Sequence, residues 1–216
     1  AAATATPDDT AARPPSIPLA INGDSLATWV MPALARLATE VTFDIHREDQ
    51  DHSAALLRDG TVMAAITTEV HPVQGCTAHR LGVMRYRPMA SPEFAARWFP
   101  EGVDAAALAH APVVVFDRKD DIQDRYLRSQ SRSRLDPPRH YVPGSADFAE
   151  AVRLGFGWAM LPDQQSAAAE ASGQLVDVHP GQQLDVTLYW QQWALRTSAL
   201  DRVAESIAAE AAHSLS

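Results

Sequence analysis

The chain has 216 residues, of which 46% are hydrophobic and 21% charged, and its formal net charge is −9 at pH 7. This length suits one sizeable domain or two small ones. No apolar run approaches the roughly 20 residues that span a bilayer, so no membrane segment or membrane partner is expected. The acidic charge disfavours direct contact with phosphate backbones. A single cysteine, Cys76, excludes an internal disulfide framework and indicates a reducing, cytoplasmic compartment.

The chain opens on an Ala/Thr/Pro-rich stretch, 1–16, which is typical of a linker or tail. Alternating strand and helix patterns follow from Ile17. Strands are predicted at 17–22, 41–46, 62–67, 81–90, 113–116, 140–142, 158–161, 174–178 and 184–195. Helices are predicted at 26–37 with a kink at Pro32, and at 49–59, 92–99, 120–130, 145–154, 163–171 and from 198 onward. Ser145 and Ser198 are expected to cap their helices.

This alternation predicts an α/β fold with a mostly parallel sheet and helices on both faces. The two long strand-like segments, 81–90 and 184–195, divide the pattern, and the stretch between them is a βα run of its own. The simplest topology is therefore two α/β subdomains joined by two crossover strands. Ligands of such sheets bind beyond the carboxyl ends of strands, so a cleft between the subdomains is the expected site for a small molecule.

Ser25, in NGDSLATW (22–29), follows the first strand at the start of a helix, and three interpretations are open. As a nucleophile it would need a G-x-S-x-G elbow, but GDSLA lacks the second glycine and no base is identifiable. As a helix cap it would accept a backbone amide. As an anion donor, it and Thr28 would face the cleft beside free amides and hold a carboxylate.

Other polar positions are expected on the same rim. PGSADF (143–148) places Ser145 at a second helix start, and Thr67 and Thr68 end a strand. Acidic clusters follow two further strands, in REDQD (47–51) and FDRKDD (116–121). Partly desolvated carboxylates attract an ammonium group. Together these positions suit a ligand with one carboxylate and two cationic groups, which is a basic amino acid.

Catalytic and metal sites are not predicted. The eight histidines show neither HExxH nor His-x-His spacing, and the chain contains no GxGxxG sequence and no P-loop. The sequence therefore indicates a binding protein without cofactors rather than an enzyme.

Several runs in this order resemble one known family: IPLAINGDSLATWVMPAL, HREDQDH, LLRDGTVMAAIT, GCTAHRLGVMRY, APVVVFDRKDD, PGSADFAEAVRLGFGWAMLP and LYWQQWAL. They resemble the effector-binding domain of LysR-type transcriptional regulators, and within that family the LysG/ArgP (IciA) branch, which controls lysine and arginine export. The resemblance covers about 17–213. NGDSLATW and LYWQQW are the runs that point to this branch.

The resemblance implies two Rossmann-like subdomains of the periplasmic-binding-protein type (type 2). Subdomain I would comprise 17–86 and 191–216, and subdomain II 87–190. The implied effector is lysine, arginine or histidine, and the implied assembly is a homodimer or tetramer. The family's N-terminal winged helix-turn-helix would lie outside this chain, so promoter DNA would be contacted only through that missing part.

The resemblance also carries ligand-binding roles onto particular positions. It implies effector contacts at the first helix start, at a strand end, in the acidic loops and at the facing helix start: Asp24, Ser25, Leu26, Thr28, Glu48, Thr67, Thr68, Asp117, Asp121, Ser145 and Asp147. A secreted solute-binding protein for amino acid uptake is the alternative, because its fold and pocket would look alike.

Overall fold

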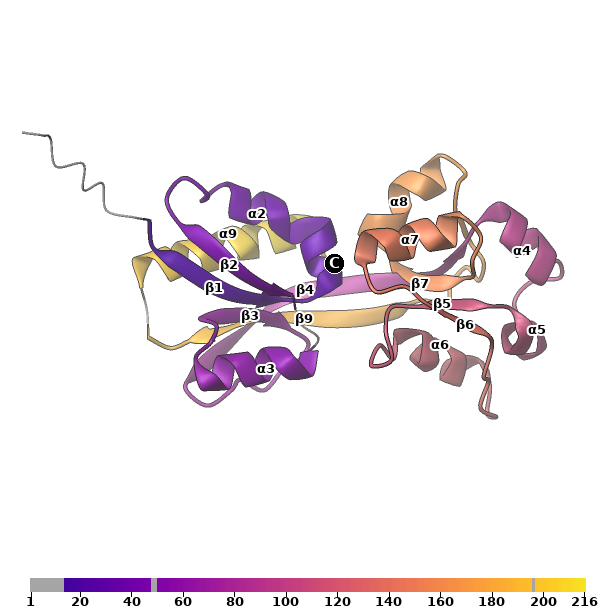
Figure 1. Cartoon of the computed structure of the whole chain (residues 1–216), viewed down its shortest axis with the longest axis horizontal. Helices are drawn as coiled ribbons and strands as arrows, with labels where there is room; N and C mark the ends of the chain where they lie inside the picture. Colours follow the sequence, from indigo (N-terminus) through magenta and orange to yellow (C-terminus); the bar gives the residue numbers. More distant parts are fainter. Residues whose placement is uncertain (1–13, 48–49, 196) are drawn as a thin grey trace, which may run out of the picture.

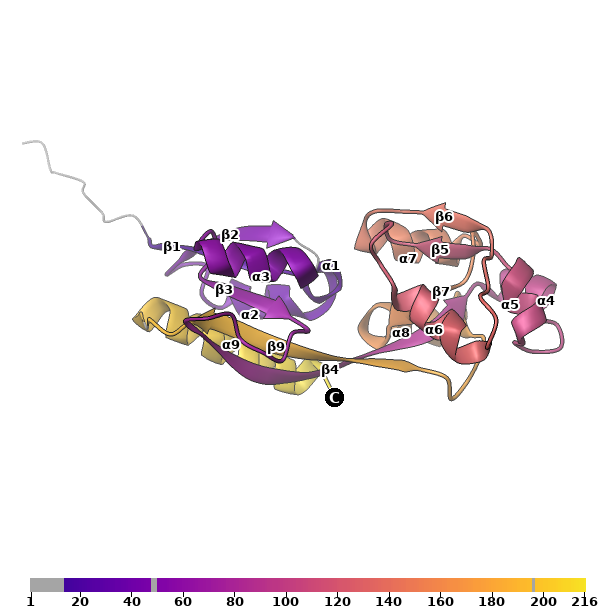
Figure 2. The same cartoon turned by 90° about the horizontal axis from the view of Figure 1, so that it is seen from below.

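The computed structural model describes residues 14–47, 50–195 and 197–216, arranged as two halves along the long axis (Figures 1 and 2). Most of the predicted tail, 1–13, lies outside these residues. Subdomain I contains β1 (Ser16–Ile21), α1 (Gly23–Ser25), η1 (Leu26–Val30), α2 (Met31–Ala35), β2 (Thr42–Arg47), α3 (Gln50–Asp59), β3 (Ala64–Thr67) and α9 (Ser198–Ser214). In Figure 1, α2 and α9 cover one face of its sheet and α3 covers the other.

Subdomain II follows β4 (Cys76–Ala90) and precedes β9 (Leu184–Trp193) in the chain, and these two long paired strands run side by side through both halves (Figure 2). It contains α4 (Pro92–Trp98), α5 (Ala105–His110), β5 (Val113–Val115), α6 (Ile122–Gln130), β6 (Arg139–Tyr141), α7 (Ser145–Arg153), β7 (Ala159–Pro162), α8 (Asp163–Ala171) and β8 (Val176–Asp177). The α/β architecture with two crossover strands is as predicted. The residue bounds of the two subdomains stay a prediction.

The main sheet is mixed, so the prediction of a mostly parallel sheet is wrong. Its strand order is β2-β1-β3-β9-β4-β7, with β8 also paired to β4. β1 is parallel to β2 and β3, whereas β9 is antiparallel to both β3 and β4, and β7 is antiparallel to β4. The cause is the crossover itself, because β4 leaves subdomain I and β9 returns alongside it in the opposite direction.

The first helical segment begins at Asn22, not at Ser25. The Asn22 side chain accepts a hydrogen bond from the Ser25 backbone amide (2.8 Å), and its carbonyl accepts the Leu26 amide (3.1 Å). The segment then passes through a π-helical stretch, η1, before Pro32 enters the first turn of α2. A proline at that position loses no helical hydrogen bond, so the helix adapts ahead of it.

Other local predictions were wrong by small margins. Thr197, not Ser198, caps α9 by accepting the Leu200 amide (3.2 Å), and Gly144 occupies the N-cap position of α7 ahead of Ser145. The short helix α5 was not predicted; its cap is Asp104. β4 begins at Cys76, five residues before the predicted strand. The prediction missed these five residues because they are exposed or half-buried and do not form an apolar alternation.

A continuous apolar core runs through both halves and keeps them in register. Trp29 of subdomain I, Trp158 of subdomain II and Trp190 of β9 are all fully buried. The Tyr126 ring meets the Trp158 ring edge-on, with centroids 5.3 Å apart. Burial of such large side chains is a major source of folding free energy. The core thereby fixes where α1 and α7 stand relative to each other.

Candidate functional site

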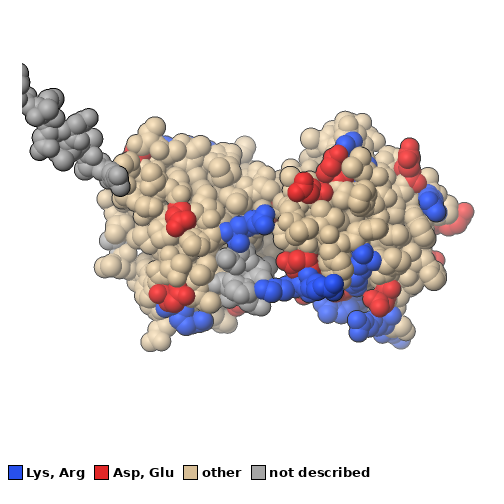
Figure 3. Space-filling view, viewed as in Figure 1, with Lys and Arg blue, Asp and Glu red and all other residues tan. Residues whose placement is uncertain are grey.

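Asp24 joins the two subdomains directly. Its Oδ1 accepts a hydrogen bond from the Ser145 hydroxyl of α7 (2.8 Å), and its Oδ2 accepts one from the Tyr86 hydroxyl of β4 (2.8 Å). A Cβ placed on Gly23 would lie 3.4 Å from Ser145 Oγ, so α1 and α7 approach closely. The two predicted helix starts therefore face each other, at the junction that Figure 3 shows as an indentation flanked by acidic and basic groups.

Ser25 is fully buried, and its hydroxyl has no hydrogen-bond partner among the described residues. The capping interpretation is wrong, because Asn22 makes the cap. The hydroxyl also contacts no base within those residues, which leaves the nucleophile interpretation without support. A buried, unpaired hydroxyl costs free energy in the absence of a partner. The anion-donor interpretation would give this hydroxyl an acceptor, and it stays a prediction.

Asp120 is the half-buried carboxylate of the FDRKDD loop. Burial raises its pKa above the ordinary value, and the negative charges of Asp24 and Asp117 raise it further. The carboxylate accepts hydrogen bonds from the Phe116 and Ile122 amides (3.3 and 3.0 Å). Asp24 and Asp120 therefore lie close enough for their charges to interact, which favours a cation near both.

Asp117 and Asp121 are the two residues of this loop that were predicted to contact the ligand. Both interact with residues close to them in the chain. Asp117 accepts the backbone amides of Lys119 and Asp120 (2.7 and 3.0 Å), and so shapes the loop. Asp121 is exposed and pairs with Arg128 two helical turns away (3.7 Å). Their assignment as ligand contacts stays a prediction, while Asp120 carries the electrostatic link to Asp24.

Two glutamine side chains that contact junction residues were not predicted. Gln123 Nε2 donates to the Asp120 carboxylate (2.8 Å), and Gln165 Nε2 donates to the Ser145 carbonyl (2.6 Å). The Asp120 carboxylate and the Ser145 carbonyl can only accept hydrogen bonds. Each glutamine therefore directs its NH2 group at this acceptor and its side-chain oxygen elsewhere. These oxygens, Gln123 Oε1 and Gln165 Oε1, are buried and find no hydrogen-bond donor among the described residues. Glutamines carry no sequence signal of this role.

The remaining predicted positions differ in what they offer. Thr28 Oγ1 donates to the Asp24 carbonyl within its own helix (2.6 Å), and Leu26 packs on the core. Thr67 is buried at the end of β3, where its hydroxyl oxygen accepts the Glu69 amide (3.1 Å), and Thr68 follows it, half-buried. Asp147 is exposed. Glu48 lies outside the described residues.

The site as a whole is rich in acceptors. Asp24 and Asp120 bring negative charge and already accept hydrogen bonds, whereas Gln123 Oε1 and Gln165 Oε1 lack a donor among the described residues. Desolvation and the adjacent Asp24 charge raise the pKa of Tyr86, which keeps its hydroxyl a proton donor at neutral pH. Among the described residues, the Ser25 hydroxyl is a buried donor without a partner, as are the Trp29 and Trp158 indole N–H groups. Such an arrangement suits a molecule with more positive than negative charge.

Arg47 closes one side of the junction. Its guanidinium, at the end of β2, lies over the Phe116 ring of subdomain II, 6.0 Å from the ring centroid. A contact of this kind is worth about 0.5–1 kcal/mol when exposed. It adds a second direct link between the halves beside the Asp24–Ser145 hydrogen bond.

Two further findings bear on the kind of site. No helix within 14–47, 50–195 and 197–216 combines the length and apolarity needed to cross a bilayer. Over the same ranges, no three His, Cys, Asp or Glu side chains gather in a way that would hold a metal ion.

Comparison with known proteins places this geometry in a family. The profile described as "LysR substrate binding domain" matches residues 16–212. The HTH-type transcriptional regulator LysG of Mycobacterium tuberculosis is 43% identical over 198 residues, which cover 90% of this chain and 64% of that protein. The HTH-type transcriptional regulator ArgP of Pseudomonas aeruginosa is 37% identical over 209 residues, which cover 96% of this chain and 69% of that protein. The chain thus spans less than two thirds of the LysG relative's length.

Solved structures agree with these relatives. ArgP from Mycobacterium tuberculosis superposes with a TM-score of 0.89 at 40% identity, covering 96% of this chain and 71% of that one. Full-length LysG from Corynebacterium glutamicum, with the effector Arg bound, gives 0.86 at 33% identity, covering 93% of this chain and 69% of that one. The fold, the family profile and these similarities agree. The chain belongs to the LysR substrate-binding domain family.

Proposed function

We propose that this chain is the sensing domain of a LysR-type transcriptional regulator of the LysG/ArgP type. It binds a basic amino acid, lysine, arginine or histidine, at the junction of the two subdomains, and through this binding controls transcription of an amino acid exporter gene. The regulator names of the relatives favour this function over secreted solute uptake.

One observation supports the ligand class: two carboxylates, Asp24 and Asp120, lie close enough at the junction for their charges to interact. In addition, Gln123 Oε1 and Gln165 Oε1 have no hydrogen-bond donor among the described residues. The cationic side chain supplies N–H groups to this acceptor-rich side, and the α-carboxylate lies against Ser25. Pairing a cation with partly buried carboxylates offsets the repulsion between them. The arginine bound in the LysG relative has this charge pattern.

Regulation follows from the way the ligand bridges the halves. Bound ligand would compete with, or add to, the Asp24–Ser145 link between α1 and α7. It can shift the balance between two subdomain arrangements only by its differential affinity for them. In the proposed homodimer or tetramer this shift changes the spacing of the DNA-binding parts, which belong to the full-length regulator in the cytoplasm.

A thermal-shift screen against the twenty amino acids tests the ligand class. Lysine, arginine or histidine should raise the melting temperature, and at one hundred times its Kd a ligand stabilises by about 2.7 kcal/mol. Glutamine and norleucine serve as controls of similar length without the cation. If neutral amino acids stabilise the chain as well as the basic ones do, or if no basic amino acid stabilises it, the proposal is wrong.

A further inference from the structure

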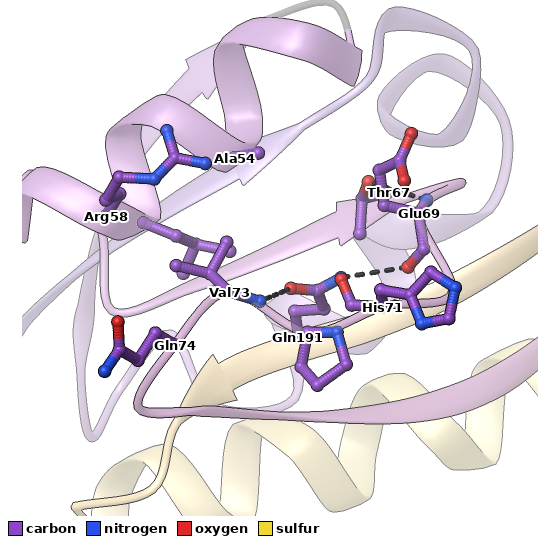
Figure 4. A pocket seen from close by; sticks show the side chains of 10 residues that line it. Ala54, Arg58, Thr67, Glu69, His71, Val73, Gln74 and Gln191 are labelled. Carbon is purple, nitrogen blue, oxygen red and sulfur yellow. Dashed lines mark hydrogen bonds between the residues drawn. The ribbon is translucent and has the colours of Figure 1, made fainter.

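A pocket of about 440 Å³ lies within subdomain I (Figure 4). Its walls are α3, Thr67 at the end of β3, the loop 68–75 between β3 and β4, and Gln191 of β9. None of its lining residues belongs to subdomain II. Its volume is in the range of small-molecule sites, about 300–1,000 Å³.

Gln191 builds this pocket by holding the loop in place. Its Oε1 accepts the Val73 amide (3.1 Å), and its Nε2 donates to the carbonyls of Glu69 and His71 (2.9 and 3.3 Å). Only 1% of the residue is exposed, so these hydrogen bonds are shielded from water. This also gives a role to the first glutamine of LYWQQW, which the ligand site at the junction does not use.

The pocket carries opposite charges at its two ends with an apolar stretch between them. Figure 4 shows Arg58 of α3 at one end, Glu69 and His71 at the other, and Val73 between. Leu57, which is buried, adds to the apolar wall. Neither Arg58 nor Glu69 has an ion-pair partner among the residues that the structure describes. Both charges are therefore free to pair with a ligand.

We propose that this pocket binds a dipolar small molecule with a carboxylate at one end, an ammonium group at the other and an apolar chain between them. Arg58 pairs with the carboxylate, because a guanidinium matches its two oxygens. Glu69 pairs with the ammonium group, and the apolar chain lies on Val73 and Leu57. The pocket shares Thr67 with the predicted effector contacts, but the proposed ligand contacts, Arg58 and Glu69, are not among them, so this proposal does not depend on the function proposed above.

Titration with ε-aminocaproate, followed by calorimetry and by amide chemical shifts, tests this site. Caproate and hexylamine each lack one charge and should bind at least about tenfold more weakly. Arg58→Gln and Glu69→Gln should each weaken ε-aminocaproate binding by about tenfold or more. Both residues are exposed, so neither change should alter the melting temperature. Arg80→Gln, an exposed arginine on β4, is the matched control and should leave binding unchanged.

Binding to the junction must be told apart, because ε-aminocaproate also resembles lysine. Ser25→Ala should leave its affinity unchanged. No binding at about 10 mM would overturn the proposal. So would affinity that survives both charge substitutions, or that is lost on Ser25→Ala. A failed amino acid screen with successful ε-aminocaproate binding would reject the proposed function alone.

Discussion

At the scale of single residues, Ser25 shows a conflict between stability and binding. Its hydroxyl is buried without a partner among the described residues, so it destabilises the ligand-free domain. The carboxylate of the neighbouring residue, Asp24, accepts two hydrogen bonds, from the hydroxyls of Ser145 and Tyr86. The residue that carries this free-energy cost, Ser25, is thus also the residue expected to bind the ligand's carboxylate.

Ser25→Ala should therefore weaken binding without lowering stability. We expect the Kd for lysine or arginine to rise about tenfold, the loss of one hydrogen bond to a charged group. The melting temperature of the ligand-free domain should stay level or rise. Calorimetric titration and thermal unfolding measure the two effects. Ser206→Ala, which removes a satisfied hydroxyl from α9, is the control and should leave binding intact.

Asp120 should make both stability and binding depend on pH. Its folded pKa is raised, so the folded state binds more protons than the unfolded state just above the ordinary value. Stability of the ligand-free domain should therefore increase as pH falls through the raised pKa. Affinity for a basic amino acid should decrease over the same window, because the protonated acid no longer attracts a cation.

Asp120→Asn separates these two effects. It removes the charge repulsion with Asp24, and also one of the two oxygens that accept the Ile122, Phe116 and Gln123 N–H groups, so the stability of the ligand-free domain should no longer increase as pH falls. It should also weaken binding of lysine and arginine by about tenfold or more, and flatten the pH dependence of affinity. Unfolding curves and titrations across pH 4–7 measure this. An Asp120→Asn domain that binds as tightly as the wild type would exclude this carboxylate from the site.

At the scale of elements, the segment from Asn22 to Ala35 sets the geometry of the junction. Asn22 caps it, η1 accommodates the approach of Pro32, and α1 presents Asp24 to α7. π-helical turns often occur at functional sites, where they re-aim side chains. A change in the cap should therefore affect both the helix and the ligand site.

Asn22→Ala should destabilise the domain by about 0.5–2 kcal/mol, because the Ser25 amide loses its capping oxygen. Asn22→Asp keeps an acceptor oxygen and should retain most of the stability. Urea unfolding measures both. Thr197→Ala removes an equivalent cap from α9 and is the control for a cap far from the ligand. Asn22→Ala should weaken ligand binding, whereas Thr197→Ala should not.

At the scale of the whole molecule, β4 and β9 belong to both subdomains at once. Ten residue pairs join them in antiparallel register, from Cys76–Trp193 to Tyr86–Leu184. Strands shared in this way couple the two cores, so the halves should unfold together rather than one after the other.

Leu188→Ala tests this coupling, because Leu188 is buried on β9 where it pairs with Gly82. The loss should be about 2–5 kcal/mol, as for other large-to-small core changes. Calorimetry should show one transition that moves as a unit to lower temperature. Two separated transitions would mean that the subdomains fold independently. Leu195→Ala, an exposed leucine beyond β9, should change little.

The sequence by itself determined the architecture, because periodic apolar patterns encode each element locally. It predicted the two crossover strands, the opposed helix starts at Asp24 and Ser145, and the family. Only the tertiary structure decided strand direction, the cap at Asn22 and the partners of each polar group. Asp120 rather than Asp121 interacts with Asp24, and Gln123, Gln165 and Tyr86 complete the site, because hydrogen bonds between residues far apart in the chain leave no pattern along it.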